Sequence, residues 1–216
     1  MKSTKKKIIH TAIDLFNLHG VGNVRIHDIA ETAGISPGNL TYHFKTKKDL
    51  IGSVHRYMKK SLEEMTIGNR IFLGMADSVE VIRDYMRFQI QFRFFYRDIL
   101  EIIRLQAEIK RDYQVQIEQI IAFNHNLIFL LIGKGYIIAE PYQGLYTSLS
   151  KNFWAVLNSW LSEREIMGIS DKAIEVGISD AMDLSYPYLT EKGKEFHFKM
   201  KKELPALLRN EMITDS

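Results

Sequence analysis

The chain of 216 residues contains no cysteine, which excludes disulfide bonds and thiolate metal sites. It also lacks a long hydrophobic run, since the longest, over residues 127–132, is far shorter than the ~20 residues that span a bilayer. The lysine-rich N-terminus is followed by a stretch interrupted by polar residues instead of a signal-peptide hydrophobic segment. These absences predict a cytoplasmic protein with no transmembrane segment and no membrane partner.

The motifs of common enzyme classes are missing as well. The histidines are scattered without an i,i+4 pair on one helix, and there is no HExxH, G-x-S-x-G, P-loop or dinucleotide-binding fingerprint. Nothing in the sequence nominates a catalytic residue, a metal site or a cofactor site. We therefore expect a protein that is not an enzyme and that uses neither metal nor cofactor.

The charge of the chain is divided unevenly along its length. Residues 1–60 hold 11 Lys or Arg against 4 Asp or Glu, a formal net charge of +7, whereas the remaining residues hold 18 against 22. This asymmetry predicts a polyanionic partner for the first part of the chain only. The lysine run at positions 5–7, taken alone, also fits a solvated surface.

The stretch 33–44 predicts a tight turn followed by a short helix. Ser36 suits the N-cap, and Pro37 has the φ angle and the missing N–H that a first helical position tolerates. Leu40 and Phe44 share one face, and the opposite face carries Gly38, Thr41, Tyr42 and Lys45. Together with a preceding helix over about 25–32, this pattern is typical of a helix-turn-helix whose second helix enters the DNA major groove.

Residues 8 to about 54 resemble the DNA-binding domain of the TetR family of repressors. The resemblance is carried by residues 12–16, Gly20, residues 28–30 and 33–36, Gly38, Leu40, residues 43–44 and Lys47. At two places the chain departs from the family. Arg25 stands where the family usually has Thr or Ser, which replaces a hydroxyl contact to phosphate by charge. Residues 40–44 read Leu-Thr-Tyr-His-Phe where the family usually has Leu-Tyr-x-His-Phe, so the resemblance does not assign a side chain to each base or predict the operator sequence.

The pattern and the resemblance together predict a set of DNA-contacting residues: Arg25, His27, Pro37, Gly38, Asn39, Thr41, Tyr42, His43 and Lys47. Thr41 and Tyr42 also suit plain exposed helix positions, and His43 suits a partly buried structural histidine as well as a phosphate contact. Lys47 begins a long helix expected over 46–65, which a Thr46–Asp49 capping box opens. The N-terminus of such a helix favours phosphate, and the resemblance implies that role for Lys47.

We predict an all-α fold. An N-terminal helix-turn-helix, a three-helix DNA-binding domain of residues 1–60, is joined by a long helix to a C-terminal helical ligand-binding and dimerisation domain of residues 61–216. Glycines at 68 and 74 mark a connection over 66–76, and the expected helices cover about 3–19, 25–32, 37–44, 46–65, 77–95, 98–110, 112–132, 145–168, 170–186 and 190–209. The resemblance implies a homodimer, formed chiefly by the helices near 145–161 and 171–186, and an inducer site in the second domain.

Asn124 shares the apolar stripe of helix 112–132 with Ile128, where an amide without a partner is costly. Its partner is either a neighbouring helix or a ligand. A second stripe is aromatic and is either core or pocket wall. With the resemblance, the two stripes predict a partly apolar small-molecule inducer in contact with Tyr85, Phe88, Phe92, Phe95, Asn124 and Ile128.

The function that we expect is therefore that of a dimeric, ligand-responsive transcriptional regulator. It would repress from a palindromic double-stranded DNA operator and leave it when a small molecule binds. The alternative is a helical small-molecule-binding protein or enzyme that has lost operator binding.

Overall fold

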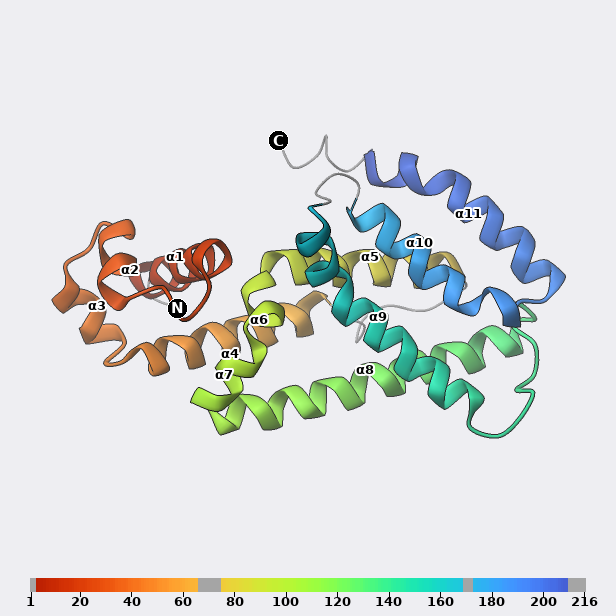
Figure 1. The fold of residues 1–216 in the computed structure, drawn as a ribbon, viewed down its shortest axis with the longest axis horizontal. Helices are drawn as coiled ribbons and strands as arrows, with labels where there is room; N and C mark the ends of the chain where they lie inside the picture. Colours follow the sequence, from red (N-terminus) through yellow and green to blue (C-terminus); the bar gives the residue numbers. More distant parts are fainter. Residues whose placement is uncertain (1–2, 66–74, 169–172, 210–216) are drawn as a thin grey trace. The chain divides into compact units, whose positions relative to one another are not determined.

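The structure is a computed structural model, and it describes residues 3–65, 75–168 and 173–209 (Figure 1). Within these ranges the structure is helical and contains no strand, only an isolated bridge between Ile137 and Leu189. The helices are α1 Ser3–His19, α2 Ile26–Thr32, α3 Pro37–His43, α4 Lys47–Met65, α5 Met75–Gln91, α6 Arg93–Arg97, α7 Ile99–Leu105, α8 Ala107–Gly133, α9 Leu145–Met167, α10 Ala173–Ser185, the 3-10 turn η1 Tyr186–Tyr188 and α11 Glu191–Arg209. The all-α prediction is confirmed. Most of the predicted connection 66–76 and the predicted start of a helix at 170–171 lie outside the described residues.

The chain forms two compact units. The first contains residues 1–68 and 88–114, and the second contains residues 69–87 and 115–216. The predicted helix-turn-helix segment, residues 1–60, is thus part of a larger unit that also includes residues 88–114. As a consequence α5 and α8 each contribute residues to both units.

The first unit is built around the turn between α2 and α3. The Ser36 hydroxyl accepts a hydrogen bond from the Asn39 amide at 3.2 Å, which confirms the predicted cap. Gly34 has a φ of +62°, in the left-handed region that favours glycine, and this lets the chain reverse between the two helices. Apolar side chains from α1, α2, α3 and α4 meet in one core, among them Ile8, Phe16, Ile29, Leu40 and Leu50.

A second capping motif opens α4. The Thr46 amide donates to Asp49 Oδ2 at 3.0 Å, and the Asp49 amide donates back to the Thr46 hydroxyl at 3.1 Å. The predicted capping box is therefore present, and it satisfies two amides that the first turn of the helix leaves free. It fixes the point at which α4 begins, with three residues between it and the end of α3.

The end of α1 is held by the last residue of α5 and by the segment that follows it. Asn17 donates from Nδ2 to the Gln91 carbonyl at 2.9 Å, and its Oδ1 accepts from the Phe94 amide at 3.0 Å. Asp98 Oδ2 accepts from the Val21 amide at 2.7 Å, just beyond α1. These contacts join parts of the chain more than 70 residues apart, and they explain why residues 88–114 belong to the first unit.

Two helices predicted as continuous are interrupted. The predicted helix over 77–95 ends at Gln91, where Phe92 leaves helical geometry with φ −117° and ψ 36°. The predicted helix over 98–110 is broken at Gln106, whose backbone is extended at φ −143° and ψ 102°. The Gln106 side chain donates to the Lys48 carbonyl at 2.8 Å. This second break is therefore accompanied by a contact with α4. Neither break contains a glycine or proline, the residues by which a sequence pattern indicates that a helix is interrupted.

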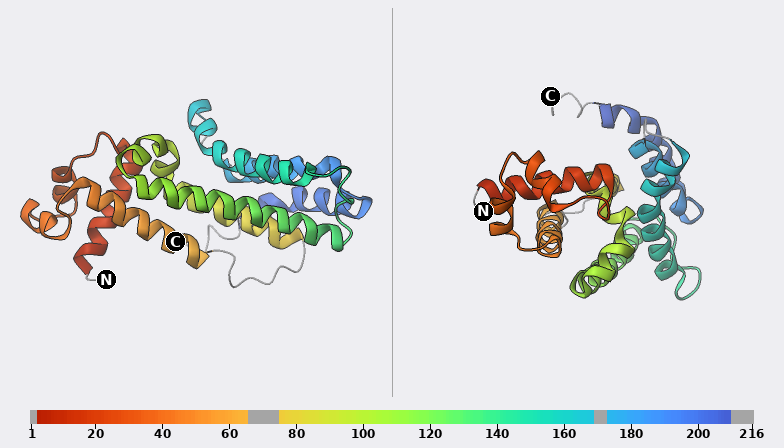
Figure 2. Two further views of the ribbon diagram at one scale, coloured as in Figure 1. Left: turned by 90° about the horizontal axis from the view of Figure 1, so that it is seen from below. Right: turned by 60° about the vertical axis from the view of Figure 1, so that its left-hand side comes forward.

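The second unit consists of the start of α5, most of α8 and the helices α9 to α11. Figure 2 shows α9 lying beside α10 in both views. The guanidinium of Arg164 on α9 donates a hydrogen bond to Oδ2 of Asp180 on α10 at 3.2 Å. Within the described ranges α8 alone is long and apolar enough to cross a membrane by length and composition. Of its residues in this unit, Ile128 and Leu131 are buried in the core.

Candidate nucleic-acid interface and ligand cavity

The recognition helix α3 has one buried anchor and an exposed face. Leu40 is completely buried, whereas Tyr42 is 81% exposed, although large aromatic residues usually bury much of their surface. Pro37, Gly38 and Asn39 are exposed at the start of the same helix. The anchor fixes the rotation of α3, so that these four predicted DNA-contacting residues are open to a partner.

The remaining predicted residues of α3 have contacts within the protein. The Thr41 hydroxyl donates to the Pro37 carbonyl at 2.8 Å, although the residue is exposed. The half-buried His43 ring meets the Tyr42 ring edge to face, with centroids 5.3 Å apart. His43 thus packs against the exposed tyrosine and limits its orientations.

Three predicted DNA-contacting residues lie outside α3. Arg25 is exposed directly before α2, and its amide donates to Asp28 Oδ2 at 2.8 Å. His27 is exposed, with Nδ1 3.9 Å from Glu31 Oε2. Lys47 is half-buried, and its ammonium donates to the Gly22 carbonyl at 3.4 Å. Burial lowers the pKa of Lys47, while the nearby carboxylates of Glu101 and Asp28 oppose that shift.

The structure also brings the N-terminal lysines close to the turn. The Lys5 ammonium lies over the Phe44 ring, 5.5 Å from its centroid, directly after α3. The Lys7 ammonium lies beside Gly34 of the turn. The positive charge of residues 1–60 is the signal in the sequence that points to these lysines, although taken alone they also fit a solvated surface.

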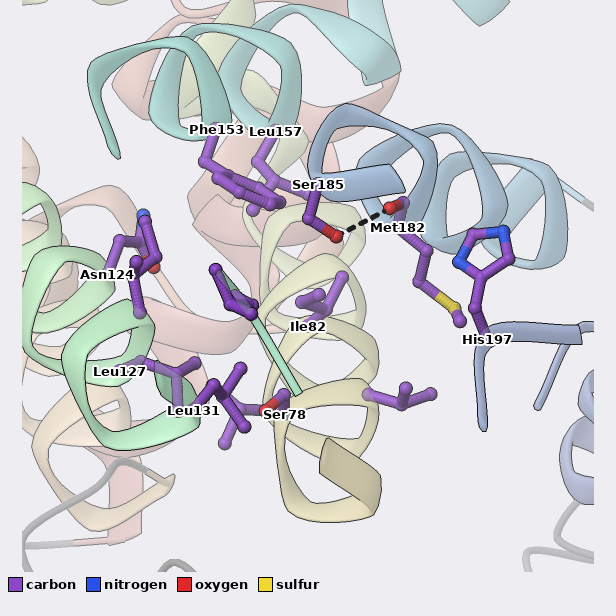
Figure 3. A pocket seen from close by; sticks show the side chains of 14 residues that line it. Ser78, Ile82, Asn124, Leu127, Leu131, Phe153, Leu157, Met182, Ser185 and His197 are labelled. Carbon is purple, nitrogen blue, oxygen red and sulfur yellow. Dashed lines mark hydrogen bonds between the residues drawn. The ribbon is translucent and has the colours of Figure 1, made fainter. Parts of the chain in front are cut away.

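A cavity of about 80 Å³ lies within the second unit (Figure 3). Its wall is almost entirely apolar, with a few polar side chains, and comes from α5, α8, α9, α10, α11 and the segment after α8. The lining residues are Ser78, Val79, Val81, Ile82, Asn124, Leu127, Ile128, Leu131, Ile137, Phe153, Leu157, Met182, Ser185 and His197. An apolar cavity with a few convergent polar groups is the usual form of a small-molecule site.

The cavity contains two of the six predicted ligand contacts, Asn124 and Ile128. The other four, Tyr85, Phe88, Phe92 and Phe95, do not line this cavity, and their contact with a ligand stays a prediction. Phe88, Phe92 and Phe95 belong to the core of the first unit, where Phe95 stacks on His55 with ring centroids 5.7 Å apart. Helical spacing identified a buried stripe correctly, but it carries no information about which unit buries it.

Sequence reasoning missed His197, which lies in the wall of the cavity and is 2% exposed. Its Nε2 is 3.1 Å from Asp183 Oδ1. Burial lowers the pKa of His197, and the attraction of Asp183 only partly offsets this effect. A signal was present in the sequence, because Gly193, His197, Met200 and Leu204 repeat at helical spacing on the buried face of α11.

Comparisons with known proteins agree with this architecture along most of the chain. The family model "Bacterial regulatory proteins, tetR family" matches residues 8–54, and the model "Bacterial transcriptional repressor" matches residues 54–196. YttP of Bacillus subtilis (strain 168), named a probable HTH-type transcriptional regulator, is 27% identical over 119 residues, which cover 51% of this chain and 58% of YttP. The chain spans about half the length of the curated relatives it matches.

Solved structures share the fold. A TetR-family transcriptional regulator from Marinobacter aquaeolei VT8 superposes with a TM-score of 0.85 at 25% identity, covering 94% of this chain and 99% of that chain. The SmeT–triclosan complex superposes with a TM-score of 0.57 at 16% identity, covering 88% of this chain and 93% of that chain. The second likeness concerns the fold alone.

Proposed function

The chain belongs to the TetR family of bacterial transcriptional regulators, and we propose that it represses transcription from a double-stranded DNA operator, which it leaves when a small molecule binds. One observation carries the proposal: α3 exposes Tyr42 and the residues of its first turn above a completely buried Leu40, in the more basic part of the chain. The proposal includes a cytoplasmic location and no catalytic activity.

The proposed contacts divide into base reading and phosphate binding. Asn39 and Tyr42 are exposed on α3, and their amide and ring are suited to base edges in the major groove. Arg25, Lys47 and the exposed Lys48 are suited to phosphates, which position the protein without reading sequence. Lys47 and Lys48 begin α4, where the free amides of the first turn favour an anion.

We propose further that the protein acts as a homodimer formed chiefly through α9 and α10. A two-fold interface of this kind brings the same surface of each protomer together. The face of α9 away from its core carries the exposed residues Asn152, Ala155 and Ser159. The two recognition helices then read half-sites about one helical turn, ~34–36 Å, apart, and the operator is a pseudo-palindrome.

The cavity is the proposed inducer site, and α5 and α8 are its proposed link to DNA binding. Ser78 on α5 and Asn124 on α8 line the cavity in the second unit. In the first unit the carbonyl of Gln91, at the end of α5, accepts a hydrogen bond from Asn17 of α1. Asp112 of α8 lies next to His55 of α4. A ligand that shifts either helix therefore acts on residues that hold the helix-turn-helix. The SmeT–triclosan complex supports a small-molecule site in this fold by analogy only.

The experiment that tests the function is a footprint of the purified protein on its own genomic DNA, followed by affinity measurements on the recovered site at several salt concentrations. We expect a pseudo-palindromic site, binding that weakens steeply with salt, and much weaker binding to unrelated DNA. Equal affinity for all sequences would reject operator binding and favour the alternative, a helical small-molecule-binding protein that has lost its operator.

A further inference from the structure

Three of the four polar residues that line the cavity each carry a buried polar atom without a partner in the described part of the chain, and they come from three different helices. Ser78 Oγ on α5, Asn124 Nδ2 on α8 and His197 Nδ1 on α11 are all buried without a hydrogen-bond partner among the described residues. The fourth polar lining residue, Ser185, donates instead to the Met182 carbonyl at 2.8 Å. A buried polar atom without a partner is destabilising unless something else supplies one, so three such atoms around one cavity point to an occupant.

The hydrogen-bonding role of His197 follows from its neighbour. An ionised carboxylate accepts hydrogen bonds and cannot donate one, and Lys201 donates to Oδ2 of Asp183. Oδ1 of Asp183 faces Nε2 of His197 and therefore needs a donor there. His197 thus carries its hydrogen on Nε2. Burial lowers the pKa of His197, which favours the neutral ring. In the neutral ring with hydrogen on Nε2, Nδ1 is an acceptor. Figure 3 shows one ring nitrogen of His197 on the side of Met182 and the other turned away.

The lining also restricts the charge of the occupant. Among the residues that the structure describes, no Asp, Glu, Lys or Arg lines the cavity, and its wall is mostly Val, Ile, Leu and Phe. A charged ligand would lose its hydration there without gaining an opposite charge in the wall. The small volume, about 80 Å³, favours a compact molecule.

We propose that the cavity binds a compact, uncharged and largely apolar molecule carrying a hydroxyl or N–H group, and that His197 Nδ1 accepts the hydrogen bond of that group. Asn124 Nδ2 donates to an oxygen of the same molecule. This inference rests on the proposed function, in which the cavity is the inducer site. It adds the chemical class of the inducer and makes His197 the residue that selects molecules with a hydrogen-bond donor.

The test compares three probes of similar size on the full chain: benzyl alcohol, benzyl methyl ether, which lacks the donor, and ethylbenzene, which lacks both donor and oxygen. Affinities are measured by titration, and the His197 ring nitrogens are followed by ¹⁵N NMR. We expect benzyl alcohol to bind at least about 5-fold more tightly than the ether, the equivalent of one hydrogen bond. We also expect it alone to shift the Nδ1 signal of His197.

Variants separate His197 from the rest of the cavity. His197→Phe should abolish the preference for the alcohol, whereas His125→Phe should keep it, because His125 lies on α8 but does not line the cavity. Equal binding of alcohol and ether to the wild type, an unchanged Nδ1 signal, a preference that survives in His197→Phe, or no binding of any probe would each overturn the inference. The wild-type NMR result stands even if His197→Phe does not fold.

Operator binding is measured in the same samples, so that the two proposals fail separately. An alcohol preference without any specific DNA binding would reject the proposed repressor and leave the cavity chemistry in place. Specific DNA binding without an alcohol preference would reject the inference alone.

Discussion

The imidazole Nδ1 of His55 on α4 lies 3.8 Å from Oδ2 of Asp112 on α8, within the first unit. The His55 ring is 6% exposed and stacks on Phe95, and Lys59 approaches the same carboxylate oxygen at 3.9 Å. This contact ties the helix that follows the recognition helix to the helix that continues into the cavity wall. Its strength therefore depends on the charge of a buried histidine.

The first prediction concerns pH. Burial is the largest effect on His55 and lowers its pKa, while Asp112 opposes the shift. The unfolded chain, with a pKa of about 6.5 for histidine, then binds the proton first, so stability is fully present above that pH and is lost as pH falls below it. We expect thermal unfolding between pH 8 and pH 5.5 to show a smaller loss of stability for His55→Phe than for the wild type.

His197 acts in the same direction, because burial lowers its pKa as well. The double variant His55→Phe and His197→Phe should therefore show the smallest change of stability with pH. The control is His27→Phe, at an exposed position, and its stability should change with pH as that of the wild type does. An identical loss of stability on acidification in His55→Phe and the wild type would contradict this assignment.

The second prediction separates base reading from phosphate binding. Tyr42→Ala removes an 81% exposed ring from α3 and should lower the ratio of specific to non-specific DNA affinity. Lys47→Ala should weaken both kinds of binding and reduce the slope of log affinity against log salt by about 1. Lys48→Ala is the matched comparison, since Lys48 is exposed and Lys47 is half-buried against Gly22. Equal losses of specificity in the tyrosine and lysine variants would refute the division.

The third prediction concerns the dimer. Ala155→Arg places a long charged side chain on the exposed face of α9, which the proposed interface buries, and should produce a folded monomer. Ala122→Arg, at an exposed position of α8, is the matched control and should remain a dimer. Sedimentation at micromolar concentration measures both. A wild type that sediments as a monomer yet binds a single half-site tightly would rule out the dimeric model of operator binding.

The fourth prediction concerns the docking of α11. A Cβ added at Gly193 would collide with the backbone carbonyl of Tyr136 and would also crowd Leu189. Since a backbone group cannot turn aside, Gly193→Ala should destabilise the protein by about 1–3 kcal/mol. Gly133→Ala is the control, because no described residue beyond its own turn of helix has an atom within 4 Å of its added Cβ. Urea unfolding compares the two, and equal stability of both variants would show that α11 adjusts without cost.

The fifth prediction is the reciprocity of ligand and operator. An inducer that weakens operator binding must itself bind more weakly in the presence of operator by the same factor, about 5–150-fold for the usual coupling of 1–3 kcal/mol. A compound found by thermal-shift screening is titrated with and without operator. Asn124→Ala should weaken its binding, because Asn124 lines the cavity. Phe92→Ala should instead lower stability, since Phe92 is buried in the first unit. Equal ligand affinity in both titrations would show that the compound is not an inducer.

The sequence by itself determined the local features of this protein. The cap at Ser36, the capping box at Thr46 and the glycine at 34 act through neighbouring residues, so their patterns predicted where α3 and α4 begin and where the turn lies. The helical spacing of apolar residues likewise predicted α1 and α9 within a residue of their observed bounds.

Only the tertiary structure decided which surfaces meet. The sequence predicts two buried helical stripes, one with Phe88, Phe92 and Phe95 and one with Asn124, and gives no reason to distinguish them. In the structure the three phenylalanines belong to the core around the helix-turn-helix, whereas Asn124 lines the cavity. The breaks at Phe92 and Gln106 lie beside contacts with α1 and α4, and His197 meets Asp183 across two helices. Periodicity records that a face is buried, but the partner that buries it is chosen by packing over the whole unit, which no local pattern contains.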